Sequence, residues 1–598
     1  MNTFVVGEKS KNAKKTGKTG IGISIWQLGN TTVRSPMRLQ AALKVILEHP
    51  ELQGAMRGPE GDKALRKLLG EAGIVVLGND TTYSVGRKWR STMEKNGFLY
   101  AALEEPELQE AFPVTDGITP LGKAFADADT LPARQECVLR DLSVPQFPIQ
   151  KDDESKGTFS PLIFVLAVML ELKKRGQEAS LSFEEFSGGI QIYTPEDGMD
   201  FVVDQVLQIR EGHDSAISKR KFKAGLYQKI LFKLGAIAPA VSTFRDYGDM
   251  NIRHLKASGV IQAHGRGIEM VSEQTALINA LVKDNPLIVK RPKKDIYESL
   301  FNGAEIPVDE ITVSEAVVED IRLTLKDSKF SKLLDSARPV TPLEAKILRH
   351  RAELLLSNKK EEDFAERQVE QLDEITNYLG VLIDPNHKPI KRADGDQVGF
   401  DKAEAPAYLE WAIWRSFLSM DGLSNEPFES RRFPIDAEFY PINTAPGRGP
   451  DLIFEFEDYV LVVEVTLTAG SRQEAVEGTS VRTHVYQELV SHEDSDGKPV
   501  YGLFIANEVD PMTFSTFKSG IYTTADYEER RLSILPLSTQ QFLEVFLGVS
   551  AKKDVAEKVF NGLISRVMAK RDVEKTKEWA ATITEEIKDY SQSIVGKA

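Results

Sequence analysis

Two acidic residues between positions 450 and 484 have the types and spacing that could support chemistry. Asp451 follows a Gly-Pro turn and opens an apolar run, and Glu464 lies a short way further along, inside the run LVVEVTLT. Such a β-branched run predicts a buried strand, where a carboxylate is costly unless a cation or partner compensates it. Two carboxylates on adjoining strands at a cleft provide the oxygen ligands of a hard divalent metal. This arrangement indicates metal-dependent cleavage of a phosphodiester.

Further polar residues accompany this pair, and each has two interpretations. Glu477, on the segment that follows Glu464, either completes a metal's coordination or orients water, or it is a surface residue of a helix. Glu410 lies in the apolar segment AYLEWAIWRSF and is either a ligand reaching the sheet edge or a member of a buried ion pair. Arg482 and His484 either contact the scissile phosphate and assist proton transfer or lie on a solvated helix face. No HxxxH or CxxC companion makes His484 a zinc ligand.

The elements that must position these residues follow from hydrophobic periodicity. We expect helix 405–420, strands near 452–457 and 459–467, helix 471–491, strand 499–506, helix 511–519 and a strand-like run at 532–537. A strand pair, a crossover helix and a further strand predict a mixed α/β sheet with the carboxylates at one edge.

Two earlier segments repeat one pattern of helix, stop glycine and strand. Residues 82–100 end their helix at Gly97 and resume as a strand, and residues 241–271 end theirs at Gly259 and continue into a hairpin turning through residues 264–267. Helix, glycine and hairpin together predict winged helix-turn-helix domains, in which a helix enters the major groove of DNA.

Basic and amide side chains in these segments are suited to bases and phosphates. The candidate DNA contacts are Arg87, Lys88, Arg90, Lys219, Arg220, Arg245, Asn251, Arg253 and Lys256. Alternatively, these are only the solvated faces of small helical domains. Two such segments on a chain that also carries the acidic motif favour DNA binding.

Length and composition set the broad class. A chain of 598 residues needs several domains, and its single cysteine excludes a disulfide framework. The net charge of −15 disfavours an architectural DNA binder, while leaving a site-specific one open. We find no apolar run of membrane-span length and no signal-peptide core, so we expect a cytoplasmic prokaryotic protein without membrane partners.

We divide the chain into four parts from its composition. They are a basic disordered arm at 1–20, a winged-helix (α+β) DNA-recognition region of two or three subdomains at 21–285, a helical linker at 286–395 and a C-terminal α/β domain at 396–598.

The motifs of the last part resemble a known family. The pattern PD–x12–EVT is similar to the PD-(D/E)xK nucleases, except that Thr466 stands at the usual lysine position. The whole set resembles the AlwI-type restriction endonucleases, which are Type IIS enzymes with strand-specific nicking relatives. Its elements here are Glu410-Trp411 with Trp414, Pro450-Asp451, Glu464-Val465-Thr466, Gly470 with Gln473 and Glu477, and Val481-Arg482 with His484. The motifs cover residues 405–510, and the agreement of the N-terminal half is architectural only.

The resemblance implies a multidomain, sequence-specific DNA endonuclease. Its N-terminal half would read a short asymmetric site, and its PD-(D/E)xK domain would cut a few base pairs outside that site. The resemblance implies catalytic roles for Glu410, Asp451, Glu464, Glu477 and, more weakly, His484. Glu410, Asp451 and Glu464 would hold one or two Mg²⁺ ions, with Mn²⁺ as a substitute. Without the lysine, Glu477 or a second metal is the preferred activator of water.

One nuclease centre cuts one strand, so cleavage of both strands would need a second copy or a partner subunit. Besides double-stranded DNA, we expect a transient homodimer or a smaller second nuclease subunit, unless the enzyme is a nickase, and a companion DNA methyltransferase encoded nearby. The alternatives are a catalytically inactive, site-specific DNA-binding regulator and a nuclease acting on RNA or damaged DNA.

Overall fold

The structure is a computed structural model of the whole chain. It describes residues 25–595 except 34, 76, 78–81, 151–152, 235–239, 335–337, 392–396, 421, 448 and 553–555. The basic arm predicted at 1–20 lies outside the described residues.

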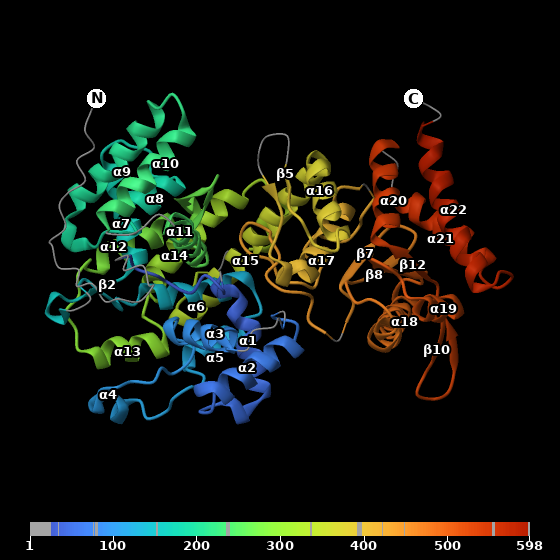
Figure 1. Cartoon of the computed structure of the whole chain (residues 1–598), viewed down its shortest axis with the longest axis horizontal. Helices are drawn as coiled ribbons and strands as arrows, with labels where there is room; N and C mark the ends of the chain where they lie inside the picture. The colour runs from blue at the N-terminus through green and yellow to red at the C-terminus, as the bar shows by residue number, and fades with distance from the viewer. Residues whose placement is uncertain are drawn as a thin grey trace. The chain divides into compact units, whose positions relative to one another are not determined.

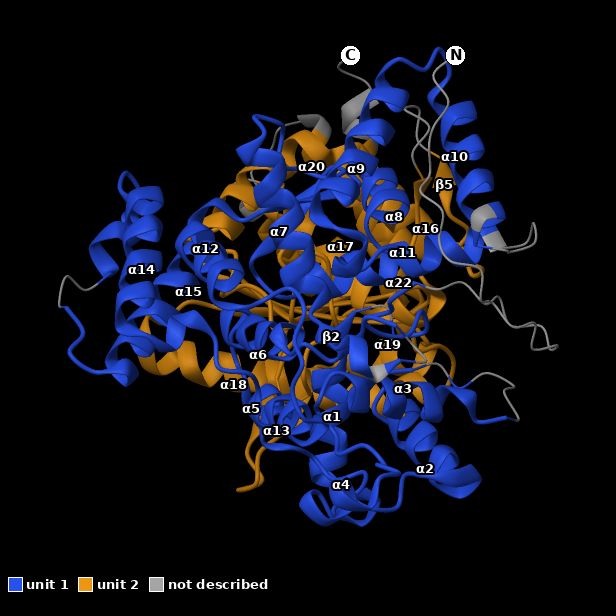
Figure 2. Cartoon of the chain, turned by 90° about the vertical axis from the view of Figure 1, so that its left-hand side faces the viewer, with its two compact units in different colours: residues 1–357 blue, residues 358–598 orange. Residues whose placement is uncertain are grey.

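The chain forms two compact units, residues 1–357 and 358–598, shown in blue and orange in Figure 2. The boundary falls inside the segment 286–395 that the sequence predicts to be a linker. Before the boundary, α14 (Ile311–Leu325) packs against α12 (Thr275–Asp284); after it, α16 (Leu372–Ile383) packs against α17 (Ala405–Leu418). The helices of this segment are therefore parts of the two cores rather than a separate spacer.

The first unit is mainly helical (Figure 1). Its other main elements are α1 (Leu39–Glu48), α2 (Gly58–Glu71), α3 (Ser84–Lys95), α4 (Pro106–Ala111), α5 (Pro120–Asp127), α6 (Leu131–Ser143), β1 (Phe147–Pro148), β2 (Thr158–Phe159), α7 (Pro161–Lys174), α8 (Phe183–Gly189), α9 (Met199–Asp214), α10 (Lys219–Lys233), α11 (Ala240–Lys256), β3 (Ile261–His264), β4 (Gly267–Met270), α13 (Lys293–Asn302) and α15 (Pro342–Glu366), which crosses the boundary.

The helix and hairpin predicted at 241–271 are present. Helix α11 ends before Gly259, whose φ of +75° is the left-handed conformation that glycine adopts at helix ends. Strands β3 and β4 pair antiparallel from Ile261 with Met270 to His264 with Gly267. Helix α8 lies against both α11 and β4, which gives a small helical group with one hairpin.

The equivalent segment at 82–100 differs from the prediction. Helix α3 ends at Lys95 and Gly97 has a φ of +65°, as expected, but the predicted strand 98–100 is reduced to a single bridge between Leu99 and Ile118. The partner segment cannot continue as a strand because Thr119 caps α5, its hydroxyl accepting a hydrogen bond from Gly122 N at 2.9 Å. This segment therefore has a helix without a hairpin.

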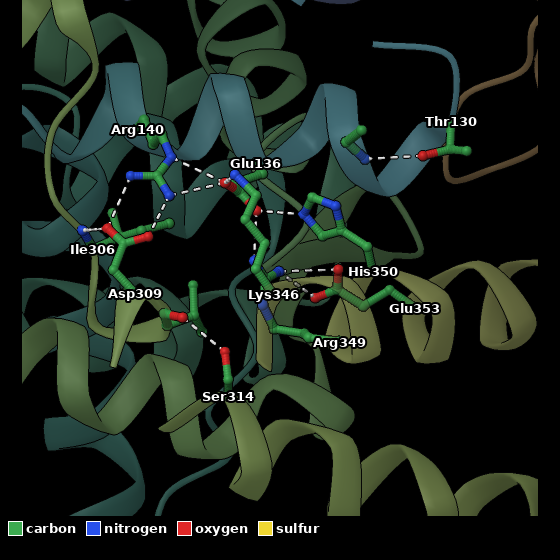
Figure 3. A network of polar contacts seen from close by, with 12 residues as sticks. Thr130, Glu136, Arg140, Ile306, Asp309, Ser314, Lys346, Arg349, His350 and Glu353 are labelled. Atoms are coloured by element: carbon green, nitrogen blue, oxygen red, sulfur yellow. Dashed lines mark hydrogen bonds and ion pairs between the residues drawn. The ribbon is translucent and has the colours of Figure 1, made fainter. Parts of the chain in front are cut away.

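A buried polar network joins α6 to α15 in the first unit (Figure 3). Glu136 is 6% exposed and accepts hydrogen bonds from Arg349 and Arg140, and it lies 2.5 Å from His350 Nε2 and 3.0 Å from Lys346 Nζ. Burial opposes its charge, but these four partners hold the pKa of Glu136 far below its ordinary value. The start of α15 is thereby attached to the core of the first unit.

The second unit is built around a four-stranded mixed sheet in the order β12-β9-β8-β7. Strands β7 (Leu452–Glu455) and β8 (Val460–Thr466) are antiparallel, whereas β9 (Val500–Ala506) and β12 (Ile534–Ser538) run parallel to β8. The other elements are β5 (Ile390–Lys391), β6 (Gln397–Val398), η10 (Glu474–Gly478), α18 (Thr479–Ser495), α19 (Pro511–Ser519), β10 (Ile521–Thr523), β11 (Glu529–Arg531), α20 (Thr539–Lys552), α21 (Ala556–Lys570) and α22 (Thr576–Val595). The predicted mixed α/β sheet is confirmed.

Alternation along β8 sends its side chains to two different cores. Leu461 and Val463 pack with α17 and the C-terminal helices, including Trp414 and Phe417. Val460 and Val462 pack on the other face with residues of α18. Glu464 is in register with this second set, so its side chain belongs to the α18 face. Among the residues that the structure describes, no helix is both long and apolar enough to cross a membrane.

Candidate active site

Asp451 and Glu464 face each other across the β7–β8 hairpin. The antiparallel register pairs Leu452 with Val463, so the next position along the ladder pairs Asp451 with Glu464. The two carboxyl groups are close enough for the charge of Glu464 to raise the pKa of Asp451, and the backbone N–H of Val465 donates to Asp451 Oδ2 at 2.9 Å. The sequence-predicted pair is therefore brought together by strand register alone.

His484 approaches the same pair from α18. This helix packs Val481 and Val485 into the core under β8, which directs His484 on the same side toward Glu464. Nδ1 of His484 lies 2.5 Å from Oε1 of Glu464, and the two residues are only 8% and 7% exposed. Burial lowers the pKa of His484, which favours the neutral imidazole.

Glu477 joins the site through a threonine. Thr466 lies two positions beyond Glu464, on the same face of β8, and its hydroxyl donates to Glu477 Oε1 at 2.8 Å. Glu477 belongs to a π-helical turn, η10, that precedes α18. Such wide turns are frequent at functional sites because they redirect one side chain. A Cβ at Gly478 would lie 2.4 Å from Glu474 Oε1, so a larger residue here would require the Glu474 carboxyl group to move.

Glu410 reaches the site from α17 on the opposite face. It is 4% exposed, and its Oε2 accepts a hydrogen bond of 2.7 Å from the backbone N–H of Ala445. The neighbouring Trp411 donates from Nε1 to the carbonyl of Phe439 at 2.6 Å. Helix α17 thus holds the loop that leads to Asp451. The ion-pair alternative for Glu410 finds no support in these partners.

The acidic groups act on one another electrostatically. Burial raises the pKa of Glu410 well above its usual range, and the charges of Asp451 and Glu464 raise it further. Burial and then Glu464 do the same to the pKa of Asp451. Burial followed by the charge of Glu477 raises the pKa of Glu464 to about 8. Three buried carboxyl groups, Glu410, Asp451 and Glu464, with the partly exposed Glu477 beside Asp451 and Glu464, form a place that a cation would stabilise.

The number and type of ligand atoms at the acidic site determine which metal ion it could hold. Within the described part of the chain, no three His, Cys, Asp or Glu side chains converge as a ready ligand cluster. Mg²⁺, however, is commonly held by only one or two carboxylates together with water molecules. The apposed oxygens of Asp451 and Glu464 match that smaller requirement, and both are the hard oxygen donors that Mg²⁺ and Mn²⁺ prefer.

Two other motif residues have structural partners. Arg482 donates from Nε to the Gly478 carbonyl and from Nη1 to the Ile521 carbonyl, both at 2.8 Å. Gln473 is fully buried and connects the loop after β8 to the loop after β9, through the Thr468 and Glu508 carbonyls and Asp510 N. These contacts shape the loops around the carboxylates.

The structure also brings in a residue that the sequence analysis did not single out. Arg432 lies beside the Pro-Asp turn: its backbone N–H donates to the Asp451 carbonyl at 3.2 Å, and its Nη1 donates to the Pro450 carbonyl at 3.4 Å. Its charge lowers the pKa of both Glu464 and His484. No spacing rule relates an arginine at this position to the aspartate that follows it in the chain, so the sequence carried no signal for it.

Two of the predicted DNA contacts are instead interior residues. Asn251 is fully buried and hydrogen-bonds to Leu28 N, the Trp26 carbonyl and Gln191. Arg90 is 7% exposed and forms ion pairs with Asp62 and Glu94. Both point into the core because α11 and α3 use those faces for packing. The prediction that they contact bases or phosphate is wrong for this structure.

The remaining predicted DNA contacts are at least partly accessible. Arg87, Lys219, Arg220, Arg245 and Arg253 are exposed, and Lys88 and Lys256 are partly exposed. Arg253 donates to Asp249 at 2.8 Å, and Lys219 donates to the His213 and Asp214 carbonyls. Their role in DNA binding stays a prediction.

A mixed sheet that carries clustered carboxylates next to a neutral histidine is the kind of site found in enzymes that hydrolyse phosphodiesters. The family comparison agrees, since the model of the AlwI restriction endonuclease family matches residues 95–545. The chain belongs to the AlwI restriction endonuclease family. The matched range contains every carboxylate of the site, and membership indicates a site-specific DNA nuclease.

Two solved structures are also similar in part. The small subunit R.BspD6I2 of the heterodimeric restriction endonuclease R.BspD6I is 21% identical, over 30% of this chain and 90% of that one, with a TM-score of 0.26. The BpuJ1 endonuclease binding domain, solved with pyrene- and phenanthrene-modified DNA, is 15% identical over 44% and 88%, with a TM-score of 0.28. TM-scores of this size are too low to define a shared fold. A comparison with curated proteins found no match.

Proposed function

We propose that this protein is a Type IIS-like DNA endonuclease that uses Mg²⁺ to hydrolyse a phosphodiester a few base pairs outside a short asymmetric recognition site. The observation that carries the proposal is the apposition of Asp451 and Glu464 across one hairpin, next to the buried Glu410 and the partly exposed Glu477. Family membership supports the nuclease activity. The Type IIS geometry and the metal are our inference.

In this proposal Asp451 and Glu464 would hold the Mg²⁺ ion, and Glu410 would complete the acidic site. When bound, the ion would act as a Lewis acid that stabilises charge on the phosphoryl oxygens and lowers the pKa of a nearby water. Mn²⁺ has similar ligand preferences and would substitute for it.

The residues around the metal pair would then position water and protons. Glu477, held by Thr466, takes the place of the missing lysine as the group that orients the attacking water. Once a metal holds Glu464 as a carboxylate, Nδ1 of His484, 2.5 Å from Glu464 Oε1, would donate to it and leave Nε2 as an acceptor able to take a proton. That hydrogen bond also fixes the orientation of the Glu464 carboxylate.

Recognition would belong to the first unit. Helix α11 with the β3–β4 hairpin is consistent with a winged-helix reader, and the exposed Arg245 and Arg253 lie on that helix. A PD-(D/E)xK-type domain with one centre cuts one strand, so the enzyme is either a nickase or cuts both strands through a transient dimer or a second subunit. A companion DNA methyltransferase would protect the host's own sites.

The proposal is tested with a supercoiled plasmid and Mg²⁺. Wild-type protein is compared with Asp451→Ala and with Asp458→Ala, a matched control in the exposed turn of the same hairpin, and the ends are mapped by run-off sequencing. Discrete ends at a fixed offset from a shared motif, absent only in Asp451→Ala, would support the proposal. Binding without cleavage by all three proteins would favour an inactive DNA-binding regulator, and cleavage without a common motif would contradict site specificity.

A further inference from the structure

Basic side chains near the acidic site are mostly engaged by protein partners. Arg431 forms a two-pronged ion pair with Glu361 and donates to the Phe433 carbonyl. Arg415 is buried and donates to Gln368, Gln371 and Glu374. Arg482 is bound to two backbone carbonyls. Each of these three cations has at least two hydrogen bonds that hold it in a structural role.

Arg432 is different. Among the residues that the structure describes, its guanidinium makes one hydrogen bond, the 3.4 Å contact from Nη1 to the Pro450 carbonyl. Four of its five N–H groups are therefore left for another acceptor. The side chain is partly exposed, so an outside ligand can reach it.

The guanidinium is also held close to the turn that presents Asp451. A Cβ at Gly449 would lie 1.7 Å from Arg432 Nη1, so a larger residue at this position would force the guanidinium to move from its present place. The backbone N–H of Arg432 is bonded to the carbonyl of Asp451 itself. The Arg432 guanidinium is thus held beside Asp451, the residue that would bind metal. Its positive charge acts on both Glu464 and His484.

We infer that Arg432 is a phosphate-binding catalytic residue, which contacts a non-bridging oxygen of the scissile phosphodiester and supplies the positive charge that the lysine of the common pattern would supply. The inference rests on the proposed nuclease function. An arginine fork matches the geometry of a phosphate and donates two parallel hydrogen bonds to it. Such donors stabilise the charge that develops on the phosphoryl oxygens in the transition state.

The test uses full-length chains and a duplex that contains the mapped site. Arg432→Gln, Arg432→Lys and Gly449→Ala are compared with wild type, with Asp451→Ala and with Arg530→Gln, a matched loss of charge on the exposed strand β11. Single-turnover cleavage is measured with Mg²⁺, site-specific binding is measured in EDTA, and thermal unfolding reports whether each variant is folded.

We expect Arg432→Gln to cleave about 10²–10³-fold more slowly with unchanged binding, since one transition-state donor is lost. Arg432→Lys should recover part of the rate because it restores the charge without the fork, and Gly449→Ala should be slow because its methyl group displaces the guanidinium. Arg530→Gln should match wild type. If Arg432→Gln does not fold, Arg432→Lys and Gly449→Ala decide the question, because both retain the cation.

Wild-type rates in Arg432→Gln, or a loss of rate that is matched by an equal loss of binding, would overturn the assignment while leaving the endonuclease intact. The same holds if lysine is no better than glutamine. Absence of cleavage by wild type and Arg530→Gln alike would instead overturn the nuclease proposal, and the role of Arg432 with it.

Discussion

The hydroxyl of Thr466 donates a hydrogen bond of 2.8 Å to Oε1 of Glu477. Thr466 stands at the position where the PD-(D/E)xK pattern has lysine. At the position where related patterns have a positively charged lysine, this chain therefore has a neutral hydroxyl, which is hydrogen-bonded to the carboxylate of Glu477. This exchange makes the site more acidic, which increases its need for a bound cation and for a positive group on the phosphate side.

The Thr466–Glu477 pair gives the first prediction. Thr466→Val removes the hydrogen bond at nearly constant volume and should slow cleavage about 10–100-fold, as loss of a supporting partner commonly does. Glu477→Gln should slow it more, because the group that we propose to orient water loses its charge. Thr483→Val is the matched control, since that hydroxyl only donates to the Thr479 carbonyl within α18. Equal rates for Thr466→Val and the control would contradict the role of the pair.

The raised pKa of Glu464 predicts how stability changes with pH. A carboxyl with a folded pKa of about 8 and an ordinary value of 4.5 binds its proton more tightly in the folded state. Its contribution to stability is complete below pH 4.5 and is lost as pH rises through 8, by up to about 1.4 kcal/mol per pH unit. Glu464→Gln should therefore gain stability relative to wild type between pH 5 and 8. Denaturant unfolding across this range measures it, and a constant difference would refute the buried, protonated Glu464.

Metal binding should stabilise the folded protein by the same logic. The proposed Mg²⁺ ion would relieve the repulsion among the carboxylates, and at ten times its dissociation constant it would add about 1.4 kcal/mol to the free energy of unfolding. Differential scanning calorimetry with and without Mg²⁺ should show a higher Tm for wild type and no shift for Asp451→Asn. Asp458→Asn, in the exposed turn of the same hairpin, should respond like wild type. If Mg²⁺ leaves the Tm of the wild-type protein unchanged, the result would argue against the metal site.

Asn251 and Arg245 lie on one helix, but mutation of Asn251 should lower stability, whereas mutation of Arg245 should weaken DNA binding. Asn251→Ala leaves Leu28 N and the Trp26 carbonyl without their partner, and should lower the free energy of unfolding by about 1–3 kcal/mol. Arg245→Gln should leave stability unchanged and weaken DNA binding, because Arg245 is exposed. Urea unfolding and a gel-shift assay with the mapped site separate the two effects. A stable Asn251→Ala that loses only DNA binding would restore the original base-contact prediction.

Much of the second unit follows from local patterns in the sequence. The β-branched run around Glu464 and the short spacing from Asp451 were sufficient to predict adjoining strands, and β7 and β8 pair as expected. Helices α17 and α19 were also predicted within a few residues, because a proline lies in the first turn of each and Gly520 ends α19. The elements that could be predicted from the sequence are those whose ends are marked by proline or glycine.

The remaining features depend on tertiary packing. Asn251 and Arg90 are polar residues on amphipathic helices, and only the packed structure shows which face turns inward. The π-helical turn at Glu474–Gly478 interrupts a segment whose sequence predicts an ordinary helix. Its two glutamates accept hydrogen bonds from Thr466 and Thr516, which lie on other elements and are brought there by the fold. Arg432 reaches the site through a chain fold that no spacing rule describes.

The hairpin that joins Asp451 to Glu464 has a consequence for folding. The two residues are brought opposite each other by closing one short turn between β7 and β8, a contact of low sequence separation that forms quickly. Glu410, on a helix that precedes the hairpin, and His484, on a helix that follows it, can join them only when helices settle on both faces of the sheet. We therefore expect the electrostatic cost of assembling the acidic group to fall late in folding, where it speeds unfolding more than it slows folding.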